Sequence, residues 1–163
     1  MKINTDGSSR GNPGSAGIGG IGRDSSGLVV FIFLANKGVQ TVNKMEGLAI
    51  LYALKRAYAL GWRKVICEVD SQVLVNLLLG RKFSGVGWQL SLLVQKILQV
   101  SSVMDLVSFI HISRECNSAA DCLAKWASED IDGRRIDEWE QLPYELCQDL
   151  ERILVEDQSQ AEE

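Results

Sequence analysis

Four acidic residues lie where predicted strands end or predicted helices begin, and this placement most strongly constrains how the chain can fold. Asp6 and Asp70 end predicted strands, Glu46 opens a predicted helix, and Asp121 lies one turn into another helix. Carboxylates in such positions can converge at one edge of a sheet. Without cations they would repel one another and raise each other's pKa. The pattern therefore predicts a site for a divalent metal ion.

Magnesium is the expected ion, because it prefers hard oxygen ligands and keeps waters that leave room for substrate phosphates. The site is accordingly interpreted as that of a metal-dependent enzyme that cleaves phosphodiesters. A single Asp at a strand end is more often a cap or turn residue. Four acidic residues in matched contexts favour the metal site over four unrelated caps.

The hydrophobic periodicity predicts one α/β domain with a layered sheet. In chain order the predicted elements are strands over 2–6, 15–23 and 28–35, a helix over 43–60, a strand over 64–70, helices over 71–79 and 87–100, a strand over 106–112 and a helix over 117–128. Short Gly-, Pro- and Ser-rich turns between the first three strands favour an antiparallel meander. The later strands are expected to be joined by helical crossovers. The glycines of the second strand are expected to leave one of its faces open to close approach.

The C-terminal region differs from the main domain, which is predicted to span residues 1–128. Residues 129–156 form an acidic extension with a helix after Pro143 that is expected to dock on the body, and residues 157–163 are predicted to be disordered. A strand that begins within three residues of Met1 is typical of a domain from a longer polypeptide, although a complete small protein is an alternative.

Charge is distributed unevenly along the chain, whose net charge is −4. Residues 1–128 hold 14 Lys and Arg against 8 Asp and Glu, and residues 129–163 hold 3 against 13. Four of the eight acidic residues in the first part are the proposed metal ligands. The remaining surface of the main domain is therefore basic, which suits binding to the phosphates of nucleic acid.

The cysteines and the hydropathy indicate an intracellular protein that does not cross a membrane. The four cysteines form no C-x-x-C pair and have unrelated spacings, so buried reduced thiols are favoured over disulfides or zinc. No apolar run approaches the roughly 18 residues that a membrane span needs. The nucleus or the cytoplasm is the expected location, with an organelle as an alternative.

Four sequence blocks resemble those of type 1 ribonuclease H domains, and they occur in the family's order. The blocks are Thr5–Gly14, Thr41–Glu46, Val69–Gln72 and Asn117–Ala124. Together they cover the chain from about residue 2 to 128. The segment His111–Asn117 and the tail around Pro143 resemble the plant ribonuclease H-like group, many of whose members are related to the ribonuclease H of plant retrotransposons.

The resemblance implies a ribonuclease H-like fold, with a five-stranded mixed sheet and helices on both faces. It also implies an endonuclease that hydrolyses the RNA strand of RNA–DNA hybrids with two Mg²⁺ ions, leaving 5′-phosphates, with Mn²⁺ as an expected substitute for Mg²⁺. Asp6, Glu46, Asp70 and Asp121 match the family's metal-binding catalytic carboxylates. Further domains of a larger polypeptide could flank this one.

Five more positions match residues with which the family binds its substrate. They are Gly11, Asn12, Thr41, Asn43 and Gln72. The amides match contacts to the RNA strand, where they suit 2′-hydroxyl groups. Gly11 would let the backbone approach a sugar, and Thr41 matches a contact to a DNA phosphate. Asn12 and Gln72 could equally be ordinary loop residues.

One departure from the family pattern bears on activity. Many members carry a histidine in the loop between the last strand and the last helix, whereas here that connection is the short segment Ser113–Cys116. The only histidine, His111, falls within the predicted strand. The alternative to an active nuclease is therefore a catalytically weak or inactive domain that binds nucleic acid or protein. All four carboxylates are present, and this favours activity.

Overall fold

The first forty residues form the predicted antiparallel meander, with strands longer than the sequence pattern indicates. The computed structural model describes residues 1–81, 85–130 and 132–161. Strands β1 (Lys2–Gly11), β2 (Gly14–Arg23) and β3 (Val29–Gln40) pair antiparallel in chain order. The prediction that β1 ends at Asp6 is wrong, because its pairing with β2 continues to Gly11.

The second half of the chain adds parallel strands through helical crossovers, as predicted. Helix α1 (Val42–Ala59) leads to β4 (Lys64–Val69), which pairs parallel to β1. Helices α2 (Gln72–Leu78) and α3 (Trp88–Ser102) then lead to β5 (Leu106–His111), which pairs parallel to β4. A 3-10 turn, η1 (Arg114–Asn117), precedes α4 (Ser118–Glu129).

The C-terminal extension adds a sixth strand, so the prediction of five strands is corrected. β6 (Arg135–Ile136) pairs antiparallel with Leu34 and Ala35 of β3, giving the strand order β5-β4-β1-β2-β3-β6. A second 3-10 turn, η2 (Trp139–Gln141), and helix α5 (Tyr144–Ala161) follow. A two-residue strand has no periodicity that a sequence reading could detect.

Helix α5 follows Pro143, where a docked helix was expected, and packs Leu146 and Leu150 into the second core, while its length differs from the predicted disorder of the tail. It continues through Ala161, so residues 157–161 are helical. Asp157 forms an ion pair of 3.2 Å with Arg23 at the end of β2. Residues 162–163, the rest of the predicted disordered tail, lie outside the described residues.

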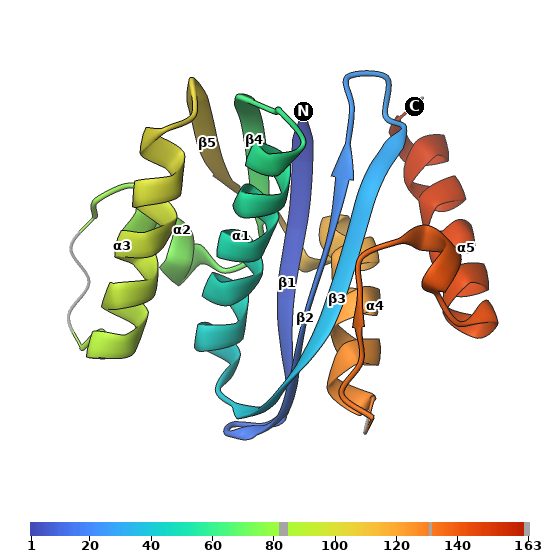
Figure 1. The fold of residues 1–163 in the computed structure, drawn as a ribbon, viewed down its shortest axis with the longest axis horizontal. Helices are drawn as coiled ribbons and strands as arrows, with labels where there is room; N and C mark the ends of the chain where they lie inside the picture. The colour runs from blue at the N-terminus through green and yellow to red at the C-terminus, as the bar shows by residue number, and fades with distance from the viewer. Residues whose placement is uncertain (82–84, 131, 162–163) are drawn as a thin grey trace.

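Helices cover both faces of the sheet and enclose two hydrophobic cores (Figure 1). Helices α1 to α3 cover the first core, to which β3 contributes Phe31 and Phe33. Helices α4 and α5 cover the second core, to which the alternate residues Ile32 and Leu34 of β3 point. This alternation explains why β3 is apolar throughout, since both of its faces are buried.

The glycines of β2 divide between both faces, which corrects the prediction that they open one. A Cβ at Gly19 would lie 2.5 Å from the backbone nitrogen of Ala124 in α4. A Cβ at Gly20 would lie 2.3 Å from the ring of Phe33 on the opposite face. Glycine is thus required on one face by a helix backbone and on the other by an aromatic ring.

Two further predictions can be compared with the described residues. Cys67, Cys116, Cys122 and Cys147 are all free thiols, but only Cys67 is buried; Cys116 is exposed, which corrects the prediction that the thiols are buried. None of the helices in the described part of the chain is both long and apolar enough to cross a bilayer.

The docking of α5 can be tested by removing one buried side chain. Leu150 is fully buried in the second core, whereas Val155 on the same helix is 66% exposed. Leu150→Ala is expected to lower the free energy of unfolding by about 2–5 kcal/mol, because it leaves a cavity. Val155→Ala should change it by less than about 0.5 kcal/mol. Urea unfolding of both variants measures the difference, and equal small effects would show that α5 does not belong to the core.

Candidate active site

The end of one strand ladder brings Asp6 and Asp70 together. The parallel pairing of β1 with β4 joins Lys2–Thr5 to Ile66–Val69 and ends there. Asp6 and Asp70 are the next residues of the two strands. Asp6 therefore lies within β1 rather than at its end. It is the first residue of β1 that no longer pairs with β4, so the edge of β1 toward β4 is uncovered from this point.

A glycine allows the third carboxylate to approach. Gly7 follows Asp6 in β1, and a Cβ at this position would lie 2.3 Å from the backbone nitrogen of Glu46 and 2.4 Å from the carbonyl carbon of Met45. Helix α1 can therefore rest directly on the β1 backbone. This close approach brings Glu46, in the second turn of α1, beside Asp6.

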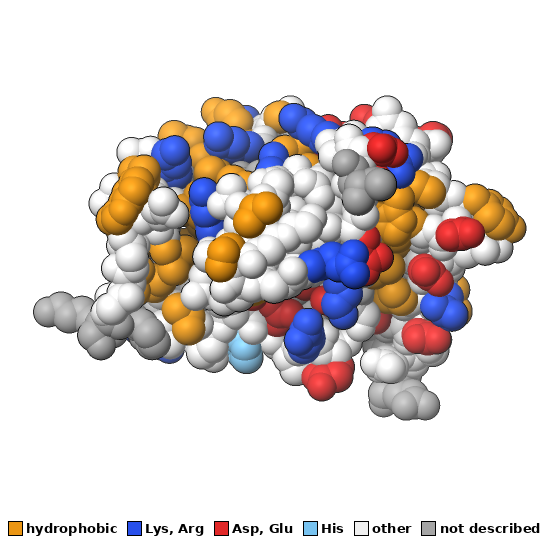
Figure 2. Space-filling view, turned by 90° about the horizontal axis from the view of Figure 1, so that it is seen from below, with side chains coloured by type: hydrophobic (Ala, Val, Ile, Leu, Met, Phe, Trp, Pro, Cys, Tyr) orange, Lys and Arg blue, Asp and Glu red, His pale blue; other side chains and the backbone are white. Residues whose placement is uncertain are grey.

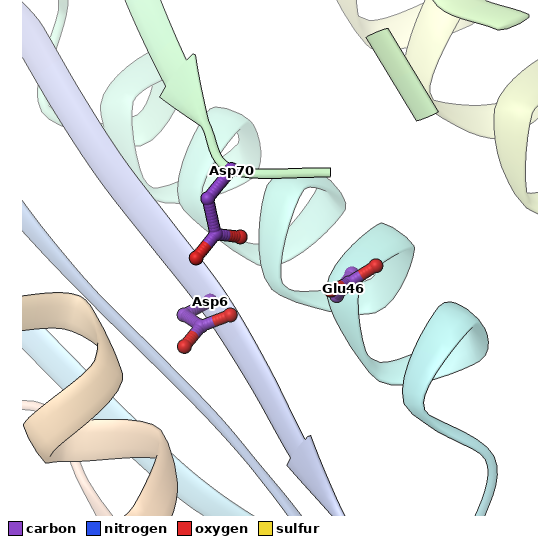
Figure 3. Close-up of side chains that lie close together, drawn as sticks. All are labelled: Asp6, Glu46 and Asp70. Atoms are coloured by element: carbon purple, nitrogen blue, oxygen red, sulfur yellow. The ribbon is translucent and has the colours of Figure 1, made fainter. Parts of the chain in front are cut away.

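Asp6, Glu46 and Asp70 form a compact carboxylate cluster (Figure 3). Each contributes one oxygen, and the three oxygens lie within 4.8 Å of one another. They line a cavity of about 310 Å³, together with Asp121, Arg114 and the start of the β1–β2 hairpin. The cavity opens at the end of the molecule shown in Figure 2, where acidic side chains lie recessed beside Lys and Arg.

Asp121 lies at the edge of this cluster. It is in the first turn of α4, as predicted, and lines the same cavity. One of its oxygens accepts a hydrogen bond of 2.8 Å from Lys125 Nζ, and the other lies 3.7 Å from Arg114. The three oxygens within 4.8 Å of one another do not include an oxygen of Asp121. The structure thus brings all four predicted carboxylates to one cavity, with three in a tight group.

Burial and mutual repulsion raise the pKa values of the clustered carboxyls. The pKa of Asp6 rises to about 8, first through burial and then through the charges of Asp70, Asp121 and Glu46. The pKa of Glu46 rises to about 7, mainly through burial, and a hydrogen bond with Ser71 opposes the rise. Burial also raises the pKa of Asp70, although Asn117 and Arg114 favour its charged form.

Two buried asparagines connect the strand that carries Asp6 to the helix that carries Asp121. Asn117, at the start of α4, donates a hydrogen bond of 2.9 Å to the carbonyl oxygen of Thr5. Asn4 in turn donates one of 3.3 Å to the Asn117 side-chain oxygen. Neither asparagine was proposed from the sequence as a site residue. No sequence signal marks Asn4, because β1 is mostly polar and the burial of Asn4 appears only in the folded structure, where buried polar groups require partners.

Arg114 is a third residue that sequence reasoning did not select. It lies in η1, in the short connection where the family's histidine is missing, and it lines the carboxylate cavity. Its guanidinium is close enough to favour the charged forms of Asp70 and Glu46.

His111 ends β5, where it pairs with Val69 and is exposed, as the strand prediction required.

The predicted substrate-binding positions fall on two sides of the cavity. The first group lies where the β1–β2 turn meets α1, and the Asn12 side-chain oxygen accepts a hydrogen bond of 3.3 Å from the backbone of Val42. This group comprises Gly11, Asn12, Thr41 and Asn43, all exposed. Gln72 begins α2 close after Asp70, is exposed and donates a hydrogen bond to Asn76.

The donor set suits hard divalent cations. The cluster offers several carboxylate oxygens, and Mg²⁺ and Mn²⁺ favour such oxygen ligands. Neighbouring carboxylates with raised pKa values also indicate an uncompensated concentration of negative charge, which bound cations would relieve. Asp6, Glu46 and Asp70 are therefore the residues fitted to hold metal, with Asp121 beside them.

The fold and this cluster define a ribonuclease H domain, and comparisons with known proteins agree. Residues 4–127 match the family model described as reverse transcriptase-like. The chain therefore belongs to this family of ribonuclease H-like domains. An Arabidopsis thaliana protein provisionally named a ribonuclease H protein is 37% identical over 127 residues, which are 78% of this chain and 20% of that protein.

Solved structures of type 1 ribonucleases H share the fold. Ribonuclease H1 from the halophilic archaeon Halobacterium salinarum has a TM-score of 0.76 and 29% identity, covering 79% of this chain and 97% of its own. LC11-RNase H1, solved in complex with an RNA/DNA hybrid, has a TM-score of 0.73 and 31% identity, covering 78% and 96%. The resemblance to type 1 ribonuclease H is thus confirmed.

The raised pKa values of the cluster predict that the free energy of unfolding depends on pH when a chelator keeps metal from binding. A carboxyl whose pKa is higher in the folded than in the unfolded protein binds more protons when folded, so stability falls as pH rises between the two values. For Asp6 this window runs from 3.8 to about 8. Asn does not titrate, so the free energy of unfolding of Asp6→Asn relative to the wild type should rise by about 3–4 kcal/mol from pH 5 to pH 8.

Urea unfolding at the two pH values, in EDTA, measures this gain. Asp105→Asn is the matched control, because Asp105 is exposed at the opposite end of the sheet, before β5. Millimolar Mg²⁺ should restore wild-type stability at pH 8 by mass action. Parallel pH profiles for the wild type and Asp6→Asn would contradict the repulsion between these carboxylates.

Proposed function

We propose that the chain is an endonuclease that hydrolyses the RNA strand of RNA–DNA hybrids with two Mg²⁺ ions, leaving 5′-phosphates. One observation carries the proposal: oxygens of Asp6, Glu46 and Asp70 lie within 4.8 Å of one another in a ribonuclease H fold. The complex of LC11-RNase H1 with an RNA/DNA hybrid supports the same class of substrate for this chain. Mn²⁺ is expected to substitute, because it takes the same ligands.

The four carboxylates would hold the metal, each from a different element of the fold. The chemistry that two bound Mg²⁺ ions supply is a lowered pKa of the attacking water and neutralised charge at the leaving oxygen. Asp6, Glu46 and Asp70 would provide the central oxygens, and Asp121 would complete the set from α4. Because protons compete with metal for Asp6 and Glu46, activity should increase as the pH approaches 8.

Arg114 would take part of the role that a loop histidine has in many relatives. Its guanidinium lies at the cavity, 3.7 Å from an oxygen of Asp121, and it is 72% exposed. An arginine cannot exchange protons near neutral pH, so it cannot serve as a general base. It can bind a phosphate oxygen of the substrate or product through its fork of N–H donors.

Recognition of the hybrid is assigned to the exposed rim of the cavity. Asn12, Asn43 and Gln72 offer amide donors and acceptors that suit 2′-hydroxyl groups of the RNA strand. Gly11 has a φ of 110°, a backbone conformation that glycine adopts readily, and its lack of a side chain leaves room for a sugar. Thr41, exposed at the start of α1, would contact a phosphate of the DNA strand.

A shallow groove between α1 and α3 would extend this surface. It has a volume of about 280 Å³ and is lined by Lys44, Lys96 and the indole of Trp88, which is 73% exposed. Cations beside an aromatic face suit a sugar–phosphate backbone. The excess of Lys and Arg in residues 1–128 supports the same partner.

Further domains are expected to accompany this one in the whole protein. The chain spans about a fifth of the length of its Arabidopsis relative. Binding of the hybrid by neighbouring domains would raise the effective concentration of substrate at this site.

Substitution of one central carboxylate tests the proposal. Asp70→Asn keeps the size of the side chain but removes its charge, so cleavage of a labelled RNA–DNA hybrid in Mg²⁺ or Mn²⁺ should fall on the order of 10³-fold. Asp105→Asn should cleave at the wild-type rate. Chelator should abolish cleavage by the wild type and by Asp105→Asn, and the products should carry 5′-phosphates.

If the folded wild-type protein cleaves the hybrid with neither metal, the proposal is wrong. Retained hybrid binding in that case would indicate the alternative, a domain that binds nucleic acid without cleaving it. Equal cleavage by Asp70→Asn and the wild type would show that the carboxylate cluster takes no part in the reaction.

A further inference from the structure

The end of the sheet opposite β6 is formed by the edge strand β5 (Figure 1). In the described part of the chain, β5 pairs with β4 and with no other strand. This pairing runs from Leu106 to His111 without a register shift. The opposite edge, that of β3, is partly covered by β6. The sheet therefore has a regular strand of six residues along one open edge.

The backbone groups of every second residue of β5 point away from β4. The N–H groups of Leu106 and Ile112 each donate a bond of 3.0 Å across to the β4 side, to residues 63 and 69. Since the register is continuous between these two bonds, Val107, Phe109 and His111 direct their N–H and C=O groups outward. Among residues 1–81, 85–130 and 132–161, no backbone hydrogen bond links these three to a segment other than β4.

β5 lacks the features that usually protect an exposed strand edge. Natural edges are blocked by charged side chains, by proline or by bulges. The sequence of β5 is Leu-Val-Ser-Phe-Ile-His, which contains no Lys, Arg, Asp, Glu or Pro, and its pairing has no bulge. Its three outward residues are therefore a template on which another strand can pair.

Exposed apolar side chains accompany this edge on one face of the sheet. Phe109 points into the first core, so the alternate residues of β5 point to the opposite face. Helix α4, on that opposite face, packs on β1, β2 and β3. Beyond it, Leu106 is 58%, Ile110 44% and Ile66 of β4 40% exposed. Ile66 pairs with Ser108, between the two β5 residues, so the three aliphatic side chains form one patch beside the open backbone.

The charges around the patch indicate a second copy of the chain as its occupant. An uncharged strand meets its own copy without like charges facing each other, and it offers no charge that would select a basic or acidic segment of another protein. Lys64 pairs with Leu106 and Glu68 with Ile110, so charges of opposite sign bound the patch. An antiparallel copy reverses this order. Each end of the joined patch then carries one Lys64 and one Glu68 rather than two like charges.

The outward residues of β5 also match their own copy in number and spacing. Two outward residues that lie opposite each other in an antiparallel pair exchange two hydrogen bonds. A two-fold axis at Phe109 places Phe109 opposite its own copy and Val107 opposite the partner's His111. Both copies of Val107 and of His111 are then used, so three pairs would form about six backbone bonds. The same register places Ser108 opposite the partner's Ile110 on the exposed face.

We propose that β5 pairs antiparallel with β5 of a second copy, so that two six-stranded sheets join into one continuous sheet of a symmetric dimer. Backbone hydrogen bonds would set the register, and the joined patches of Leu106, Ile110 and Ile66 would be shielded from water. The contact involves one strand and a few side chains of each copy, so the dimer is weak. It does not depend on the activity of the carboxylate cluster.

Sedimentation velocity and NMR on the full chain test this proposal. The sedimentation coefficient of the wild type should rise from that of a monomer to that of a dimer between about 10 µM and about 1 mM protein. Over the same range, amide resonances of Val107, Phe109 and His111 should shift with concentration. Those of Asp6 and Glu46 should not.

Two matched substitutions locate the contact. Ile110→Glu places a carboxylate of each copy beside the junction, where the two repel each other, and should weaken the dimer at least about 10-fold. Val30→Glu is the control, because Val30 lies on the other edge strand, β3, and is 45% exposed against 44% for Ile110. It should dimerise as the wild type does. Circular dichroism checks that both variants are folded.

Several outcomes would overturn the proposal. A wild type that stays monomeric at every concentration would show that the β5 edge does not bind its own copy. Equal dissociation constants for Ile110→Glu and Val30→Glu would show that the dimer contact is not at β5. Concentration-dependent amide shifts confined to residues outside β5 would show the same without any substitution.

Discussion

The repulsion among carboxylates held by a rigid frame is the interaction on which the site depends. The β1–β4 ladder ends immediately before Asp6 and Asp70, and Gly7 lets the backbone of α1 bring Glu46 against them. These residues cannot easily move apart, because Asp6 lies in β1, Glu46 lies in α1 and Asp70 directly follows β4. The pKa values of Asp6 and Glu46 are raised first by burial and then by this repulsion. Bound cations would be attracted by the same carboxylates that repel one another. The fold holds these carboxylates close together before any cation binds.

Much of the site could be predicted from the sequence because its residues lie in local contexts. Asp70 directly follows an apolar strand, and Asp121 lies in a first helical turn, so each position could be read from neighbouring residues. Asp6 was placed at the end of its strand, although β1 continues to Gly11, since glycines and serines do not show strand periodicity. The position of Asp6 depends on where pairing with β4 ends, and this is a property of tertiary structure.

The features that were missed depend on contacts between distant parts of the chain. Arg114 and Asn117 reach the site because a short connection folds back from β5 to α4. β6 and the full length of α5 form because Ile136 and Leu150 complete a core built from β2, β3 and α4. The same extension covers part of the β3 edge, so the acidic segment that departs in composition from the main domain is also a structural part of it.

The location of bound metal tests the central claim most directly. Crystals of the protein grown or soaked with Mn²⁺ can be measured at the manganese absorption edge, where anomalous scattering identifies the ions. The account predicts anomalous peaks within about 2.0–2.5 Å of carboxylate oxygens of Asp6, Glu46 and Asp70. A well-ordered carboxylate cluster without such a peak, or manganese bound only at other residues, would contradict it.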